Sequence, residues 1–147
     1  MTVVRDEHGS AIVEFVWLAI LLLVPLLYIV LAVFDTQRAS YAASAAARSA
    51  TRAFVTSSDQ ASAYARATAA ARLAFVDQGI DGRGFTLSIT CRPDPHQCLT
   101  PGSVVAAEVH ATADLPLMPT ALGDNTPHIS IAATHRSPYG TFREARP

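Results

Sequence analysis

The chain has 147 residues, 50% of them hydrophobic, and its formal net charge at pH 7 is −1. This length accommodates one small domain plus a membrane anchor. A net charge this close to zero provides no basic field for nucleic acid, so we expect no nucleic-acid partner.

The first predicted element is an apolar helix that follows a short polar segment. Residues 1–9 (MTVVRDEHG) are polar and charged, whereas residues 15–34 carry no charge at all. At about 1.5 Å of rise per residue, this run as a helix spans the hydrocarbon core of a bilayer, which is roughly 30 Å thick. The run is too long for the apolar core of an ordinary signal peptide. We therefore expect residues 10–34 to form a membrane-spanning helical segment.

One carboxylate, Glu14, stands where the apolar run has already begun at Ala11. An unpaired carboxylate inside a membrane costs on the order of a few kcal/mol, which makes it a candidate functional residue. One interpretation is that Glu14 snorkels to the interface from the first helical turn, where the helix dipole also favours a negative charge. The other is that an ammonium group pairs with Glu14 and offsets the cost of burying it.

The residues Gly9 to Phe15 (GSAIVEF) resemble the cleavage motif of type IV prepilins. Together with a proline in the middle of the helix, they most resemble TadE-like pseudopilins of the tight-adherence (Flp) pilus system, and the resemblance extends to about Arg52. It implies that a prepilin peptidase cuts after Gly9, removes residues 1–9 as a leader peptide and leaves a new amine on Ser10. It also implies that Glu14 pairs with the amine of a neighbouring subunit and sets the stagger of subunits in an assembly. Phe15 completes the motif.

The apolar helix is expected to continue beyond the membrane. Pro25 removes one backbone hydrogen bond in mid-span, so we expect a kink or a loosened turn there. Residues 35–56 contain no proline or glycine and are rich in the helix formers alanine and arginine, so the helix should run to about Phe54. One smooth stripe, made of alanines and one phenylalanine, runs along this extension: Ala39, Ala43, Ala46, Ala50 and Phe54. Such a stripe allows close packing, either on the protein's own domain or on a neighbouring subunit.

Residues 57–147 are expected to form a small α+β domain outside the cytoplasm. A second helix should run from about Asp59 to Asp77 and stop at Gly79, and Ser57 and Gln60 have the spacing of a capping box at its start. One face of this helix is expected to pack in the core, and it comprises Tyr64, Thr68, Ala71 and Phe75.

Alternation of apolar and polar residues predicts three strands, over Phe85 to Cys91, over Val104 to Leu115 and around Ile129 to Ala133. The segment Pro116 to Pro127 contains three prolines and is expected to be a loop. A hairpin followed by a longer return indicates a three-stranded antiparallel sheet with one face covered by helix. The predicted fold is therefore α+β and pilin-like, with a long N-terminal helix.

The two cysteines, Cys91 and Cys98, bracket a short loop between the first two strands. A disulfide there closes a loop of about eight residues and is worth about 2–3 kcal/mol in the chain-entropy model. The alternatives are two free thiols or a metal site, for which His96 is the only nearby additional ligand. We expect a disulfide, no metal and no cofactor.

The sequence offers no catalytic motif. The five histidines include no i,i+4 metal pair and no HExxH, and no G-x-S-x-G accompanies a serine. The acidic and imidazole groups of Glu108, His110 and Asp114 are close in sequence, but on the outer face of a strand such residues are usually solvated. We therefore expect a protein that is not an enzyme.

The charges that flank the span conflict with the expected orientation. The amino side carries only Arg5, whereas Arg38, Arg48 and Arg52 follow the span, so the positive-inside rule places the carboxyl end in the cytoplasm. We expect the opposite orientation, because a prepilin-like cleavage site must face a cytoplasmic peptidase and a cysteine pair suits an oxidising exterior.

The resemblance implies a minor pseudopilin of a tight-adherence pilus or a related secretion system, held in the cytoplasmic membrane by a single span. Its expected partners are membrane lipid, the prepilin peptidase, other pilins or pseudopilins, and the tight-adherence assembly machinery. The alternative is an exported domain with an uncleaved single-pass anchor that binds a partner in the cell envelope.

Overall fold

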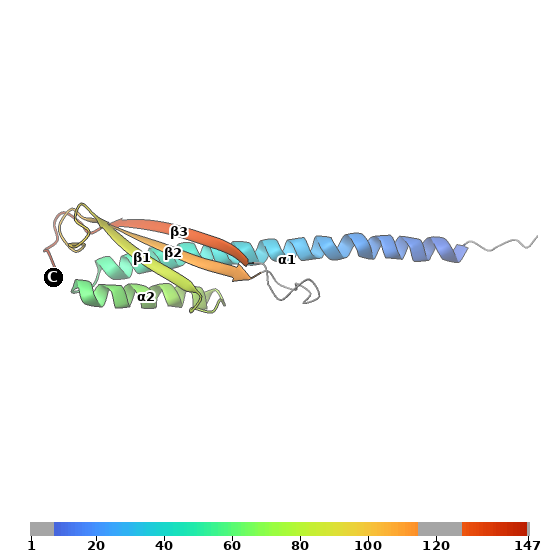
Figure 1. Ribbon diagram of the computed structural model, residues 1–147, viewed down its shortest axis with the longest axis horizontal. Coiled ribbons are helices and arrows are strands. Elements are labelled where there is room, and N and C mark those ends of the chain that lie inside the picture. Colours follow the sequence, from blue (N-terminus) through green and yellow to red (C-terminus); the bar gives the residue numbers. More distant parts are fainter. Residues whose placement is uncertain (1–7, 115–127, 147) are drawn as a thin grey trace, which may run out of the picture.

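The computed structural model describes residues 8–114 and 128–146. It contains the helices α1 (His8–Val55) and α2 (Gln60–Asp77) and the strands β1 (Phe85–Arg92), β2 (Val104–Asp114) and β3 (His128–Pro138). The N-terminal part of α1, residues 8–34, projects as a rod, and the remaining described residues form a head in which the sheet covers α2 and the rest of α1 (Figure 1). The predicted α+β fold, with a long N-terminal helix, a second helix and a three-stranded antiparallel sheet, is confirmed.

Helix α1 is one uninterrupted helix of 48 residues that joins the rod to the head. It continues through Pro25 without a break, so the bend expected there stays a prediction. The small-residue stripe predicted along its second half is buried against α2 and the sheet. Of the two interpretations of that stripe, the structure therefore realises packing on the protein's own domain.

Helix α2 starts differently from the prediction. Asp59 is its N-cap residue, and the Asp59 carboxylate accepts the backbone N–H of Ser62 at 2.8 Å. The predicted capping box of Ser57 and Gln60 is wrong. The Ser57 hydroxyl instead donates to the carbonyl oxygen of Ala53 at 2.7 Å, because this carbonyl lies in the last turn of α1 and has no partner within the helix.

The face of α2 that enters the core also differs in part from the prediction. Tyr64 and Thr68 are exposed, whereas Ala71 and Phe75 are buried as expected. The buried side chains of α2 are Ala63, Ala67, Ala71, Ala74 and Phe75. The alanine stripe of α1 approaches most closely when α2 also presents alanines. This places the ring of Tyr64 at the border of the contact, where it meets Phe54 edge-on with 5.0 Å between ring centroids.

Helix α2 ends near Gly79, as predicted. Gly79 adopts φ of 69°, a left-handed conformation that glycine tolerates without steric cost. The backbone N–H of Gly79 donates to Val76 at 2.8 Å, and the N–H of Ile80 donates to Phe75 at 3.0 Å. These two bonds occupy carbonyl groups of the last helical turn and direct the chain towards β1.

The sheet has the strand order β1-β2-β3, and both pairs are antiparallel. Its inner face packs on the helices through residues that alternate along each strand: Cys91, Val105, Ala107, Val109 and Ile131 are buried. The alternation predicted for the first two strands is thus confirmed. The loop predicted over residues 116–127 lies outside the described residues.

The C-terminal residues close the end of the head that lies farthest from the rod. Tyr139 is buried, and its hydroxyl donates to the carbonyl oxygen of Glu144 at 2.7 Å. The guanidinium of Arg143 donates to the Val55 carbonyl at 2.7 Å, and that of Arg146 donates to the Ser57 carbonyl. These cations sit at the carboxyl end of α1, where the helix dipole favours positive charge. No sequence pattern predicted a role for these residues.

Candidate functional site

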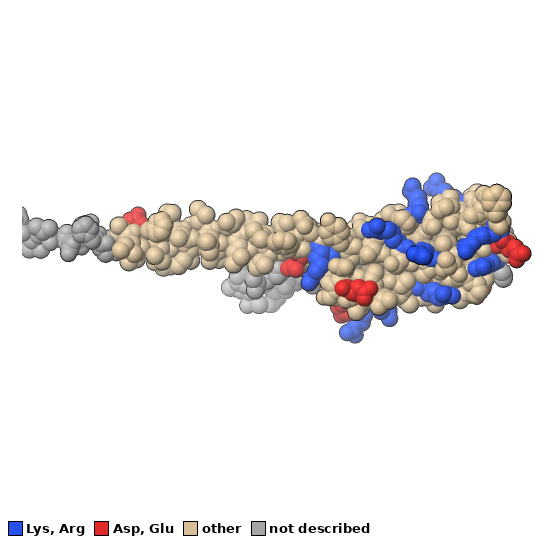
Figure 2. Space-filling model, turned by 180° about the vertical axis from the view of Figure 1, so that it is seen from behind, with Lys and Arg blue, Asp and Glu red and all other residues tan. Residues whose placement is uncertain are grey.

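The rod is the most unusual surface of the molecule. All side chains from Ala11 to Phe34 are exposed except those of Tyr28 and Ala32, which are partly buried. An 18-residue window of this helix has a mean hydropathy of 2.9, so the helix is long and apolar enough to cross a membrane. On the face that Figure 2 shows, the rod carries no arginine, and the arginines gather on the head. Water is a poor solvent for such a surface, because each large apolar side chain gains about 1.5–3 kcal/mol when it is buried.

Helix α1 already includes the residues of the prepilin-like motif. Gly9 and Ser10 lie in its first turn, since the helix begins at His8. Ser10 and Glu14 are four residues apart in one continuous helix and therefore lie on the same face. Glu14 and Phe15 are both exposed. Within residues 11–34, Glu14 is the single charged side chain. None of the salt bridges among the described residues involves Glu14.

The predicted disulfide between Cys91 and Cys98 is present, and both residues are buried. It clips the loop that connects β1 to β2 at the end of the head away from the rod. The backbone N–H of Cys98 also donates to the side-chain oxygen of Gln60 at 3.3 Å. The disulfide loop is thereby tied to the start of α2, so Gln60 anchors this loop instead of capping its own helix.

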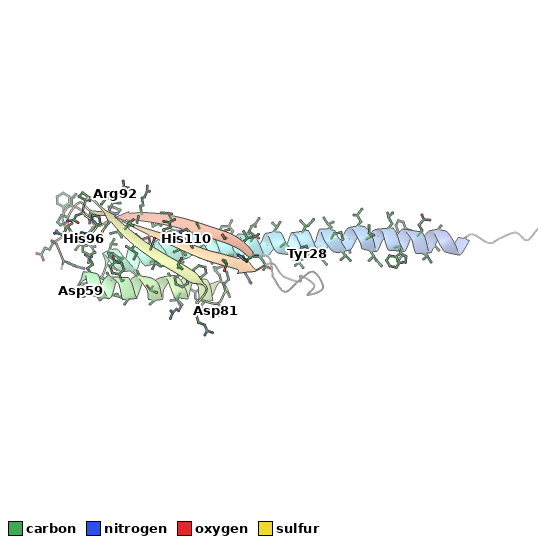
Figure 3. All side chains as sticks on the ribbon, viewed as in Figure 1. Tyr28, Asp59, Asp81, Arg92, His96 and His110 are labelled. Carbon is green, nitrogen blue, oxygen red and sulfur yellow. A yellow bond between two sulfur atoms is a disulfide. The ribbon has the colours of Figure 1, made fainter. Side chains whose placement is uncertain are left out.

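The titratable side chains of the head do not converge on one point. His96 lies on the disulfide loop, whereas His110 lies on the open face of the sheet (Figure 3). His110 contacts the carboxylate of Glu108 at 3.0 Å, and both side chains are about half exposed, as expected for a solvated pair. Across residues 8–114 and 128–146, no group of three or more His, Cys, Asp or Glu side chains could hold a metal ion. The side chain of Asp114 lies outside the described part of the chain.

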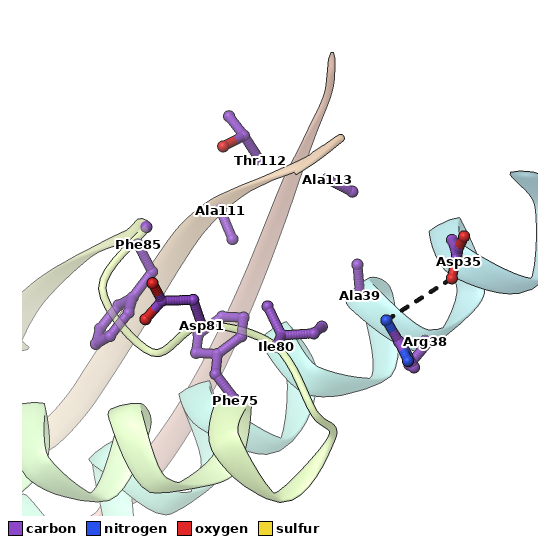
Figure 4. A pocket seen from close by; sticks show the side chains of 11 residues that line it. Asp35, Arg38, Ala39, Phe75, Ile80, Asp81, Phe85, Ala111, Thr112 and Ala113 are labelled. Carbon is purple, nitrogen blue, oxygen red and sulfur yellow. Dashed lines mark ion pairs between the residues drawn. The ribbon is translucent and has the colours of Figure 1, made fainter. Parts of the chain in front are cut away.

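A cavity of about 400 Å³ lies where the rod enters the head. Apolar side chains, including Phe75 and Phe85 in a stacked pair with centroids 5.1 Å apart, form part of its wall. Asp35 and Arg38 stand at one side with 3.7 Å between their charged atoms, and Asp81 stands at another (Figure 4). Exposed ion pairs of this kind contribute about 0–1 kcal/mol to the free energy of unfolding. The Asp35–Arg38 pair therefore lies at the solvated rim of the cavity and stabilises the fold little.

No family model, curated protein or solved structure matches this chain. Its function is therefore inferred from the residues of the rod and from how the rod is joined to the head.

Proposed function

We propose that this protein is a minor pseudopilin of a tight-adherence pilus or a related secretion filament. In this proposal the chain enters the cytoplasmic membrane through the rod, is cleaved after Gly9 by a prepilin peptidase, and joins other pilins or pseudopilins and their assembly machinery. The observation that carries the proposal is Glu14: it is exposed, it is the single charged side chain within the apolar residues 11–34, and it lies four residues after Ser10.

The free energy of the carboxylate explains why this position matters. A charge within the hydrocarbon costs on the order of a few kcal/mol, and a paired ammonium group offsets that cost. Within its own chain, cleavage after Gly9 would create an amine on Ser10, one helical turn from Glu14. A second copy could supply the same amine from a shifted position. The helix would then associate with others in a defined stagger, because an offset by one turn leaves the carboxylate unpaired.

The junction between rod and head supports a filament subunit over a freely tethered domain. A flexible linker would let an anchored domain move independently of its span, whereas α1 passes from rod to head as one helix. The second half of α1 is also buried against α2 and the sheet. Any shift or rotation of the rod therefore moves the head with it, which a subunit placed by helix packing requires.

The mature amino terminus tests the proposal most directly. The protein extracted from membranes of cells with an active prepilin peptidase should begin at Ser10 when it is analysed by N-terminal sequencing. The same protein from cells without the peptidase, and the Gly9→Ala variant in either strain, should begin at Met1. An intact Met1 in the presence of the peptidase would contradict the proposal and favour the uncleaved anchored domain.

A second variant separates processing from assembly. Glu14→Ala should be cleaved as efficiently as the native protein, because the cut lies at Gly9, but it should be absent from purified filaments. Glu14→Asp is the matched control, since it keeps the charge and should retain part of the incorporation. Equal incorporation of Glu14→Ala and the native protein would show that the carboxylate has no role in assembly.

The orientation of the head is tested with the native cysteines. Cys91 and Cys98 should react with a membrane-impermeant thiol reagent after mild reduction of cells whose outer barrier alone has been opened. If they react only after the cytoplasmic membrane is permeabilised, the head faces the cytoplasm, as the positive-inside rule indicates.

A further inference from the structure

The cavity where the rod enters the head begins at the end of the apolar run. Residues 11–34 form about 36 Å of helix at 1.5 Å per residue, which is enough to cross a hydrocarbon core of about 30 Å. The next residue, Asp35, lines the cavity together with Arg38 and Ala39. A span that ends at Phe34 therefore places the cavity at the surface of the membrane. This placement rests on the membrane anchor of the proposed function.

The extent of the cavity along α1 matches the thickness of the lipid headgroup layer. This polar layer is about 5–7 Å thick on each side of a bilayer, and α1 rises by about 6 Å from Asp35 to Ala39. The other walls come from the end of α2, the turn that follows it, the start of β1 and the end of β2, all at the end of the head that adjoins the rod (Figure 1). A lipid beside the rod thus has its headgroup at the level of the cavity.

The rim of the cavity carries charges of both signs. Arg38 and Asp35 pair at 3.7 Å, and their side chains are 52% and 38% exposed. Asp81 lies at another side of the cavity (Figure 4), is 70% exposed and pairs with Arg83 at 3.3 Å. Both pairs use the Oδ1 atom of the carboxylate, and no other described residue forms a hydrogen bond with the Oδ2 atom of either. The rim therefore keeps positions at which a ligand can form hydrogen bonds.

We propose that this cavity binds the headgroup of a phospholipid with a primary ammonium group, of the phosphatidylethanolamine type. Arg38 binds the phosphate, because a guanidinium group pairs with phosphate through two parallel hydrogen bonds. The carboxylate of Asp81 accepts hydrogen bonds from the ammonium group. The stacked rings of Phe75 and Phe85 provide an apolar wall for the methylene groups in between, and aromatic rings also attract ammonium groups. The acyl chains lie along the exposed apolar surface of the rod.

The composition of the rim disfavours two other common headgroups. The cavity is lined by two carboxylates and one guanidinium group, those of Asp35, Asp81 and Arg38. An anionic headgroup such as that of phosphatidylglycerol is repelled by the two carboxylates and brings no cation to pair with them. The trimethylammonium group of phosphatidylcholine has no N–H to donate, so it leaves the carboxylates without hydrogen bonds. A zwitterion whose cation donates hydrogen bonds complements all three groups.

Native mass spectrometry of the full chain tests the choice of headgroup. The protein is purified in a mild detergent and mixed with equal amounts of phosphatidylethanolamine, phosphatidylcholine and phosphatidylglycerol, which carry the same acyl chains. The protein should retain one molecule of phosphatidylethanolamine in preference to the other two lipids. Equal retention of the three lipids, or a preference for either of the other two, would overturn the proposal.

Four variants test the position of the site. Arg38→Gln should lower the retention of phosphatidylethanolamine about tenfold, as expected when a hydrogen bond to a charged group is lost. Its matched control is Arg52→Gln, which is exposed on the same helix about 21 Å farther along and should retain the lipid like the native protein. Asp81→Asn should also lower retention, whereas Asp77→Asn, which is exposed and outside the cavity, should not. Equal losses from each variant and its control would show that the lipid adsorbs elsewhere on the protein.

The measurement separates this site from the proposed function, because lipid retention requires neither cleavage after Gly9 nor filament assembly. A chain that is cleaved and joins filaments, but retains phosphatidylethanolamine no better than the other lipids, would overturn the lipid site alone. A chain that keeps Met1 in the presence of the peptidase, and still retains this lipid through Arg38 and Asp81, would support the lipid site and contradict the pseudopilin.

Discussion

The close contact between α1 and α2 leads to a quantitative prediction about alanines on one helix. Ala67 is completely buried where the two helices meet, whereas Ala69, two residues along α2, is exposed. Replacing Ala67 by leucine forces three additional carbon atoms into a packed contact between small residues. Overpacking of this kind costs about 1–3 kcal/mol. Ala69→Leu adds the same side chain to the same helix in solvent and should change the free energy of unfolding by no more than about 0.5 kcal/mol.

The assay is thermal unfolding of the full chain in detergent, followed by near-ultraviolet circular dichroism of the aromatic side chains in the head. For a head of this size, each kcal/mol shifts the midpoint by about 4 °C, so Ala67→Leu should lower Tm by about 4–12 °C. Ala69→Leu should leave Tm almost unchanged. Equal midpoints for the two variants would refute the assignment of the buried face. A larger loss from Ala69→Leu would mean that α2 is rotated so that Ala69, and not Ala67, faces α1.

Three further predictions concern the head. Replacing both Cys91 and Cys98 by alanine should lower the free energy of unfolding by about 2–3 kcal/mol in a urea titration, and a reductant should then have no further effect on the variant. Arg143→Ala removes the donor to the last carbonyls of α1 and should cost about 0.5–1 kcal/mol in the same titration, whereas a change at the exposed Phe142 should cost nothing measurable. The hydrogen bond from the Ser62 backbone N–H holds the pKa of Asp59 below its ordinary value of 3.8. A lowered pKa stabilises the fold above the unfolded-state pKa and loses that effect as the pH falls through the folded-state pKa. The stability difference between the native protein and Asp59→Asn should therefore be constant from pH 5 to 7 and narrow below about pH 4, and a difference that widens in acid would contradict this assignment.

The features that the sequence predicted correctly are those with a strong local signal. An uncharged run of apolar residues has one stable backbone conformation in a membrane, so α1 was predictable over nearly its whole length. Period-two alternation predicted the inner faces of β1 and β2, and two cysteines separated by a short loop predicted the disulfide. In each case the pattern depends on neighbours a few residues away in the chain.

The incorrect predictions concern choices between nearly equal local alternatives. Ser57 and Asp59 are both good N-cap residues, and the end of α1 decides between them, because the Ala53 carbonyl takes the Ser57 hydroxyl. Along α2, two overlapping faces are rich in small or apolar residues. Only the approach of α1 selects the face with Ala63 and Ala67, and that approach leaves Tyr64 at the border.

The sequence by itself determined an apolar helical run with one carboxylate near its start, and the chemistry of Glu14 follows from that arrangement in any apolar surrounding. The tertiary structure decided what lies at the other end of the helix. It placed Arg143 on the Val55 carbonyl at the end of α1 and Arg146 on the Ser57 carbonyl just beyond that end, and it left β1 at the border of the sheet. Both results depend on contacts between residues far apart in the chain, whose cost in chain entropy and gain in packing no local pattern records.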